Sequence, residues 1–440
     1  MSKKTDETVI VWRSRNLHPA FSLLIFVAAV PSAQAQSPLA VPVDGEPFAA
    51  RLTSVDAQGK LGFDVAGKPR TLAAADLVAW GQPAELRKGP ILVLADGGFL
   101  PAAVLAADKA ELSVDSARWG TLKLPLDWLA GIVFRPPPHP AELDALLDRV
   151  ARGEGQTDRL ILDNGDELTG LIEAENLGSD TLKIKGNLGP VPVAVRRIVA
   201  LVFNPALRQQ PAADHDHGYM AGTRHLEQDS ITPGAGSAGA AWIGLADGGR
   251  LLAARLQLQG DSLELTTLSG AKWKAEATDL VFFMPAPARA CPGRTVYLSD
   301  IRPNEYRFLP YLETKWPYQT DRNVTGGQLR CGGRLYLKGL GVHSAAVLRY
   351  KLDRPWNRFQ AEVGIDDSTG GRGSVGFRVF VDGKDGRKLK YTNSPIRGGM
   401  PPQAISIDLA GATQLDLVVD YGEAGDVMDH ADWLNARLVK

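Results

Sequence analysis

Aromatic and hydrogen-bonding side chains are available together in the last third of the chain. The candidate aromatic contacts are Trp316, Tyr318, Tyr391 and Trp433. The candidate hydrogen-bonding side chains are His343, Asn393 and His430. A sugar presents an apolar C–H face and a ring of hydroxyls, so a sugar site needs an exposed ring beside fixed donors and acceptors. If the fold brings these residues together, they form such a site.

Two of these residues have a purely structural alternative. Trp433 lies where the last strand should begin, and an aromatic residue there is more often part of a core. His343 follows a turn, so its ring can instead tie a loop to the backbone. The position of each ring in the fold decides between these interpretations.

Six motifs in the same region carry a family resemblance. They are YLSD at residues 297–300, GLGVHS at 339–344, FQAEVGIDD at 359–367, GSV at 373–375, VDG at 381–383 and DHADWLNARL at 429–438. In this order they resemble the NPCBM family of carbohydrate-binding modules, which is associated with glycosyl hydrolase family 98. The resemblance covers residues 294–440 and implies a galactose-binding-like jelly roll, with two antiparallel sheets and loops gathered at one end.

The resemblance also implies a candidate metal site, because jelly rolls of this superfamily often hold a structural calcium ion. Calcium takes about six to eight oxygen ligands, and Asp366, Asp367 and Asp432 are the carboxylates available to supply some of them. The spacing of an EF-hand loop is absent. Turn chemistry before Gly370 also explains the pair Asp366 and Asp367 without any metal.

Four imperfect copies of one β pattern precede this region. Each copy runs an apolar strand into a turn, continues with a short alternating strand and closes on an apolar run before proline. The turns begin at Asp44, Asp96, Asp163 and Asp247, a spacing too irregular for a solenoid or a propeller. The pattern resembles Sm-like or SH3-like barrels. No chemical motif accompanies it, so we carry no RNA-binding function across.

We therefore expect an all-β protein: an N-terminal array of small SH3/Sm-like β-barrel repeats followed by a galactose-binding-like jelly-roll β-sandwich. The expected segments are two repeats at 36–138, a short helical connector at 139–153, a third repeat at 154–205, a flexible linker at 206–240, a fourth repeat at 241–290 and the sandwich at 291–440. The connector is predicted from Leu143, Leu146, Leu147 and Val150, which recur at helical spacing.

The N-terminus predicts export. Four basic residues precede the apolar run from Phe21 to Val30, and Ala33-Gln34-Ala35 supplies a cleavage site, so residues 1–35 form a predicted signal peptide cut after Ala35. This run is too short to cross a hydrocarbon layer, which needs about 20 apolar residues. We expect a secreted, periplasmic or cell-surface protein with no membrane span.

An exported chain meets oxidising conditions, so Cys291 and Cys331 are expected to form a disulfide. The alternative is two buried free thiols that act as small hydrophobic groups. Asn323-Val324-Thr325 is a glycosylation sequon, whose use depends on the host.

Charge and motifs restrict the function. Lys plus Arg is 49 against 50 for Asp plus Glu, a balance that argues against a nucleic-acid partner. No GxSxG, HExxH, GxGxxG or P-loop pattern follows the signal peptide, so we expect no enzyme.

The leading hypothesis is a non-catalytic protein that binds a glycan or polysaccharide, with the repeats as scaffold or protein-docking site. The alternatives are a structural or interaction component of a cell-surface or periplasmic assembly, and an unrecognised glycoside hydrolase or an accessory part of one.

Overall fold

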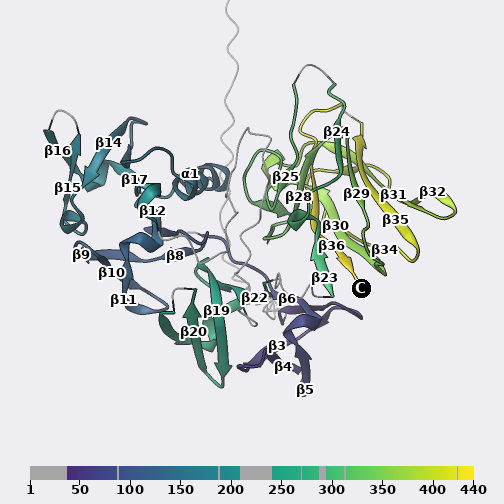
Figure 1. The fold of residues 1–440 in the computed structure, drawn as a ribbon, viewed down its shortest axis with the longest axis horizontal. Coiled ribbons are helices and arrows are strands. Elements are labelled where there is room, and N and C mark those ends of the chain that lie inside the picture. Colours follow the sequence, from purple (N-terminus) through teal and green to yellow (C-terminus); the bar gives the residue numbers. More distant parts are fainter. Residues whose placement is uncertain are drawn as a thin grey trace, which may run out of the picture. The chain divides into compact units, whose positions relative to one another are not determined.

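The computed structural model describes residues 37–86, 89–186, 189–208, 240–268, 270–286, 294–311, 314–423 and 425–440. In these ranges the regular structure is one α-helix, several single 3-10 turns and many β-strands, which confirms the all-β fold class (Figure 1). The predicted signal peptide and residues 209–239 of the predicted linker lie outside the described residues.

The four repeats share one strand order. The first contains β1 (Leu39–Pro42), β2 (Phe48–Ala49), β3 (Arg51–Val55), β4 (Lys60–Val65), β5 (Lys68–Ala73) and β6 (Leu77–Gly81). The second contains β7 (Ile91–Leu94), β8 (Phe99–Pro101), β9 (Ala103–Ala107), β10 (Glu111–Ser116), β11 (Gly120–Pro125) and β12 (Leu129–Val133). The third contains β13 (Asp158–Leu162), β14 (Glu167–Ile172), β15 (Thr181–Gly186), β16 (Gly189–Ala194) and β17 (Ile198–Val202). The fourth contains β18 (Ala241–Leu245), β19 (Arg250–Gln259), β20 (Ser262–Thr267), β21 (Lys272–Glu276) and β22 (Leu280–Pro285).

Each repeat closes by pairing its first strand with its last. These pairs are β1 with β6, β7 with β12, β13 with β17 and β18 with β22. A 3-10 turn precedes each closing strand: η1 (Ala74–Asp76), η2 (Leu126–Trp128), η4 (Val195–Arg197) and η6 (Ala277–Asp279). Closure removes the free edge of the first strand, as in small β-barrels.

Glycine and aspartate set the first hairpin turn in at least two repeats. Gly97 has φ +86° and Gly248 has φ +90°, a conformation that a side chain would strain. The carboxylates of Asp96 and Asp247 each accept a hydrogen bond from the N–H two residues further on, at 2.9 Å. This turn chemistry explains why the Asp-Gly signal in the sequence marks the strand ends.

The repeats also pair with one another through their closing strands. β12 and β17 pair antiparallel with Ile132 opposite Leu201, and β6 and β22 pair antiparallel with Trp80 opposite Phe283. Each of these four residues is the fourth residue of its closing strand. The second repeat therefore joins the third, and the first joins the fourth, in the same register.

Helix α1 (Pro140–Arg152) connects the second and third repeats, with proline at its first position. Its buried face carries Leu143, Leu147 and Val150, which share an apolar cluster with strand residues such as Ile91 and Val202. The helix is thus packed onto the repeats, as its periodicity indicates. The remaining 3-10 turns are η3 (Ala174–Asn176), η5 (Pro205–Leu207), η7 (Leu298–Asp300) and η8 (Asp367–Thr369).

The C-terminal region is a β-sandwich. One sheet has the order β25 (Gln319–Thr320), β28 (Gly339–His343), β36 (His430–Val439), β30 (Arg358–Ile365) and β34 (Gln403–Asp408), with β23 (Thr295–Tyr297) added on β36. The other has the order β24 (Glu305–Phe308), β29 (Ala346–Lys351), β35 (Ala412–Tyr421), β31 (Ser374–Gly383) and β32 (Gly386–Thr392), with β33 (Ile396–Arg397) on β31. A separate hairpin contains β26 (Leu329–Cys331) and β27 (Arg334–Tyr336).

The sandwich core positions the loops at its two ends. Large buried rings, including Phe359, Phe377 and Trp433, fill the space between the sheets. β36 begins at His430 and runs toward the C-terminus (Figure 1). The end of the sandwich at which β36 begins, opposite the C-terminus, is called the rim below.

The sandwich also contacts the repeats. Val43 and Phe282 of the repeats share an apolar cluster with Tyr297 and Val439 of the sandwich. Asp44 of the first repeat forms ion pairs with Arg294 and Arg358. Among the described residues, no helix is long and apolar enough to span a membrane.

Candidate functional site

Three aromatic side chains meet at the rim. His343 ends β28 and His430 begins β36, where the two residues lie directly opposite each other. The ring of Trp316, in the segment before β25, stacks on His343 with centroids 4.7 Å apart and planes 6° from parallel. The His430 ring lies 6.0 Å from both other rings. The structure therefore brings together Trp316, His343 and His430, and we call them the Trp316 cluster.

Local contacts hold these rings in place. The Tyr306 hydroxyl donates to the Trp316 carbonyl at 2.5 Å, and Phe308 meets His343 edge to face at 6.2 Å. His343 Nδ1 lies 2.8 Å from the carbonyl oxygen of Ser344. Both histidines are buried, whereas Trp316 is half-buried. The indole is thus the ring of the cluster that is most open to a ligand.

Burial favours the neutral form of His430. Desolvation lowers the pKa of this imidazole below its usual range, and the neighbouring His343 lowers it further. Nδ1 of His430 lies 3.5 Å from the Oγ of Ser368, an exposed residue. A neutral imidazole donates one hydrogen bond and accepts another, which suits a hydroxyl-bearing ligand.

A network of polar side chains lies beneath the rings of the rim. Ser344 Oγ donates to Asp429 at 2.5 Å, and the backbone N–H of Ser374 donates to the same carboxylate at 3.0 Å. Burial raises the pKa of Asp429 above its usual range. Ser374 Oγ in turn accepts from the N–H of Glu423, whose exposed carboxylate pairs with Arg397 at 2.6 Å. No spacing in the sequence links Arg397 to Glu423, because only the strand order makes them neighbours.

The other sequence candidates lie elsewhere or face inward. Tyr318 packs on Tyr306 at 5.0 Å, against the core. The side chain of Tyr391 reaches Gln403, with its hydroxyl 3.5 Å from the side-chain amide oxygen of Gln403. Asn393 accepts a hydrogen bond from the N–H of Phe377 at 2.8 Å. These three residues support the sandwich itself.

Trp433 is a core residue. Its side chain is fully buried, and its ring meets Phe377 edge to face at 5.1 Å. A ring enclosed between two sheets cannot stack on a sugar, so the expectation that Trp433 contacts ligand is wrong. The structural alternative for an aromatic residue in the last strand is correct.

The three candidate calcium ligands are engaged differently. The two oxygens of Asp366 accept hydrogen bonds from Asn323 Nδ2 and from the N–H groups of Ser368 and Arg330, all at 2.9–3.0 Å. Asp367 accepts from two backbone N–H groups, those of Gly332 and Gly333. N–H donors directed at a carboxylate repel a cation at the same oxygens. Across the described ranges, no group of three or more His, Cys, Asp or Glu side chains is placed to hold a metal ion, so calcium binding stays an untested prediction.

Asp432 has an unusual environment. The carboxyl group is fully buried, and burial together with the adjacent Asp366 raises its pKa well above its usual range. Among the described residues, no N–H group donates to either oxygen, and the carboxyl group faces that of Asp366. Burial therefore favours the protonated form of Asp432.

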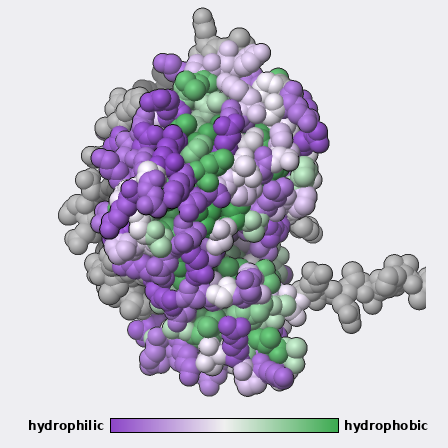
Figure 2. Space-filling model, turned by 90° about the vertical axis from the view of Figure 1, so that its right-hand side faces the viewer, coloured by the Kyte–Doolittle hydropathy of each residue, from purple (hydrophilic) through white to green (hydrophobic). Residues whose placement is uncertain are grey.

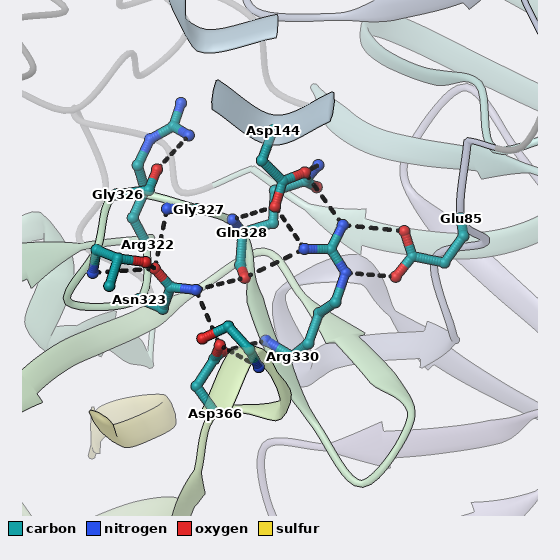
Figure 3. Close-up of polar contacts among 11 residues, drawn as sticks. Glu85, Asp144, Arg322, Asn323, Gly326, Gly327, Gln328, Arg330 and Asp366 are labelled. Atoms are coloured by element: carbon teal, nitrogen blue, oxygen red, sulfur yellow. Dashed lines mark hydrogen bonds and ion pairs between the residues drawn. The ribbon is translucent and has the colours of Figure 1, made fainter. Parts of the chain in front are cut away.

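One polar network joins the repeats to the rim (Figure 3). The Arg330 guanidinium binds Glu85 at 2.6 and 3.0 Å and Asp144 of helix α1 at 2.5 and 3.1 Å. Gln328 donates to Asp144 from both its backbone and its side chain, at 2.8 and 2.7 Å. The backbone N–H of Arg330 donates to Asp366, which also fixes Ser368 beside His430. The segment that carries Gln328 and Arg330 is thus anchored to the repeats, and we call this segment the loop beneath the rim.

This network also encloses the sequon. Asn323 is buried, its Nδ2 donates to Asp366, and its Oδ1 accepts from the N–H groups of Thr325 and Gly327 (Figure 3). A glycan on this amide would replace a buried hydrogen bond. The sequon is therefore a structural turn in the folded protein.

Cys331 is a buried free thiol of hairpin β26–β27, in a small apolar cluster with Leu329, Tyr336 and Leu434. Burial raises its pKa, so the group is inert at neutral pH. Cys291 lies outside the described residues. The disulfide between Cys291 and Cys331 therefore stays a prediction, and in the structure Cys331 packs as a small apolar group.

Known proteins are similar to parts of this chain. Residues 294–439 match the NPCBM/NEW2 domain family. A protein of Renibacterium salmoninarum named as an endo-alpha-N-acetylgalactosaminidase is 31% identical over 166 residues, which cover 36% of this chain and 10% of that protein. The alpha-1,3-galactosidase B of Akkermansia muciniphila is 33% identical over 121 residues, covering 26% of this chain and 14% of that protein. The chain thus spans only a small part of both curated relatives.

Two solved structures are similar at lower identity. The CBM51 module of Clostridium perfringens GH95 in complex with methyl-galactose is 24% identical, covers 33% of this chain and 99% of that chain, and has a TM-score of 0.30. The CBM51-2 and INT domains of Clostridium perfringens ZmpB, with GlcNAc bound to CBM51-2, are 24% identical, cover 41% of this chain and 36% of that chain, and have the same TM-score. The sequence match and the two-sheet fold agree that residues 294–439 of this chain are an NPCBM/NEW2 domain.

Proposed function

We propose that this protein binds a glycan without cleaving it, through the rim of its NPCBM/NEW2 domain. The observation that carries the proposal is the half-exposed Trp316 ring, held parallel to His343 beside His430. A fixed ring accepts the C–H face of a sugar at little entropic cost, because its rotamer is already restricted. Its polar neighbours supply donors and acceptors for the hydroxyls.

The relatives support a class of ligand. Both curated relatives carry the names of enzymes that act on galactose-type sugars. We infer that the glycan contains galactose or N-acetylgalactosamine. Export through the predicted signal peptide, residues 1–35, would place the domain where such glycans are found.

The three aspartates buried beside the Trp316 cluster support a non-catalytic role for the cluster itself. Glycoside hydrolysis requires two carboxyl groups about 5–9.5 Å apart on either side of an accessible bond. Asp366, Asp429 and Asp432 are all buried, and each is at most 1% exposed. A glycosidic bond cannot reach between them unless the sandwich opens.

The repeats act in this proposal as a scaffold. Arg330 ties the loop beneath the rim to both Glu85 and Asp144 of the repeat region. This contact fixes the domain on a larger body and so restricts how the rim is presented. Capture of a protein partner by the repeats is the alternative function, and it stays a prediction.

The test is a glycan array probed with residues 36–440 and with a Trp316→Ala variant. We expect wild-type binding to galactose-containing glycans and a loss of at least about tenfold in the variant, because a central aromatic contact contributes about 2 kcal/mol. Leu389→Ala is the control, since this exposed side chain lies on edge strand β32, outside the rim. Wild-type protein that is folded and binds no glycan would refute the proposal, as would unchanged binding by Trp316→Ala.

A further inference from the structure

A second aromatic ring is exposed on the rim. Tyr311 is 62% exposed and is the only exposed Phe, Tyr or Trp across the described parts of the chain. Leu309, two residues before Tyr311, is 57% exposed. Val427, two residues after Gly425, is 59% exposed. Figure 2 shows that hydrophobic residues on one face of the molecule form patches within a largely hydrophilic surface. Neighbouring exposed apolar groups such as Leu309 and Tyr311 can mark a binding surface.

Fixed neighbours support the Tyr311 ring. It meets Tyr421 edge to face, with centroids 5.8 Å apart and planes at 75°. The Tyr421 hydroxyl donates to the Leu309 carbonyl at 2.8 Å, which holds the segment that carries Tyr311. Gly425 lies against the ring, so a side chain there would approach the Tyr311 ring to 3.9 Å. We call Tyr311 and Tyr421 the tyrosine pair.

The tyrosine pair is continuous with the Trp316 cluster. The N–H of Leu309 donates to the carbonyl of Ala345 at 2.9 Å, and the preceding residue Phe308 contacts His343. A short backbone ridge therefore separates the two sets of rings. His343 belongs to one sheet and Tyr421 to the other, and packed sheets lie about 10 Å apart. One sugar ring cannot reach across this span, whereas a short oligosaccharide can.

Polar groups accompany the tyrosine pair as well. The exposed Arg397 and Glu423 side chains form a bidentate ion pair at 2.6–3.1 Å, and Glu423 lies two residues after Tyr421. A guanidinium supplies fixed donors and a carboxylate supplies acceptors for vicinal hydroxyls. The second location thus repeats the combination found at the first: an accessible ring with polar groups beside it.

We propose that the tyrosine pair is a second subsite, which binds an internal sugar of the same oligosaccharide whose terminal sugar lies on the Trp316 cluster. This inference rests on the proposed function and specifies its ligand as a chain of at least two sugars. Affinity should therefore grow with oligosaccharide length, and Tyr311 should supply the increase.

The test is a calorimetric titration of residues 36–440 with two series of probes. Each series contains a monosaccharide, a disaccharide and a trisaccharide with the same terminal sugar, galactose in one and GlcNAc in the other. The proteins are wild type, Tyr311→Ala, Tyr311→Phe, Trp316→Ala and the control Leu389→Ala. Tyr311→Phe keeps the ring and so should behave as wild type.

The expected pattern separates the two subsites. Tyr311→Ala should bind the monosaccharide as wild type does and lose about fivefold in affinity for the trisaccharide, in keeping with one aromatic contact. Trp316→Ala should weaken binding of all three probes. If Tyr311→Ala binds every length as wild type does, or weakens the monosaccharide equally, the second subsite is refuted while glycan binding stands. If wild type binds neither series, the second subsite and the galactose-type ligand are both refuted.

Discussion

Replacing Asp144 by alanine removes the carboxylate through which helix α1 holds the loop beneath the rim. Asp144 is 1% exposed and accepts four hydrogen bonds, two from Gln328 and two from the Arg330 guanidinium. The variant leaves the Arg330 charge in a largely buried position with Glu85 as its remaining partner (Figure 3).

The expected cost follows from these contacts. Breaking a buried ion pair by removing one partner costs about 3–5 kcal/mol, and an unsatisfied buried N–H costs about 1–3 kcal/mol. Glu85 still neutralises Arg330 in the variant, and water can enter the space left by the side chain. We therefore expect Asp144→Ala to lower the free energy of unfolding by about 3 kcal/mol.

The assay is chemical denaturation of residues 36–440 followed by tryptophan fluorescence. Glu264→Ala is the matched control, because the Glu264–Lys274 pair has the same 2.5 Å contact on exposed side chains, where solvent screens the charges and the pair should add little stability. A double-mutant cycle with Arg330→Ala should give a coupling energy of about 1–3 kcal/mol. A loss below about 1 kcal/mol in Asp144→Ala, or a coupling energy near zero, would refute the claim that this network anchors the sandwich.

Two further predictions concern buried groups of the sandwich. Because burial and Asp366 raise the pKa of Asp432, the folded state keeps a proton that the unfolded state releases, and stability should fall as pH rises above about 4. Asp432→Asn should therefore gain stability over wild type at pH 7, and the difference should vanish near pH 3 in denaturation series; an equal difference at both pH values would contradict this. Dithiothreitol distinguishes the two states of Cys331: with the free thiol that the structure holds, the unfolding midpoint should stay unchanged, whereas reduction of a disulfide to Cys291 would cost about 3–4 kcal/mol.

Local sequence chemistry is enough to predict the elements of the repeats. The turns at Asp96 and Asp247 form where the Asp-Gly pairs stand, because the carboxylate bonds and the positive φ of glycine are properties of a few adjacent residues. The apolar spacing of Leu143, Leu147 and Val150 similarly predicts the buried face of helix α1. The joining of β12 to β17 and of β6 to β22 is long-range, and no local pattern indicates it.

The candidate site is only partly predictable for the same reason. Residue type alone cannot separate Trp316 from Trp433, because both are tryptophans near strand ends. Trp433 faces the other sheet and is enclosed, whereas Trp316 lies in the segment before β25 and stacks on the end of β28. Tyr311, Arg397 and Glu423 were missed because loops distant in sequence bring them to one rim.

The buried polar groups show the limit of composition arguments. Two cysteines in a chain predicted to be exported suggest a disulfide, while the structure holds Cys331 buried as a free thiol, with Cys291 outside the described residues. Carboxylates in a turn suggest a cation, and in the structure Asp366 and Asp367 accept backbone N–H groups, so turn chemistry explains their position with or without a cation. In both cases the deciding information is which groups surround the side chain, and this depends on packing between distant segments.

The most direct measurement of the central claim is a crystal structure of residues 36–440 with the tightest-binding glycan of the array. We predict a terminal sugar ring against the indole of Trp316, with its hydroxyls near His430 and Ser368. A glycan bound away from the rim, or on the rim without contact to Trp316, would contradict the account.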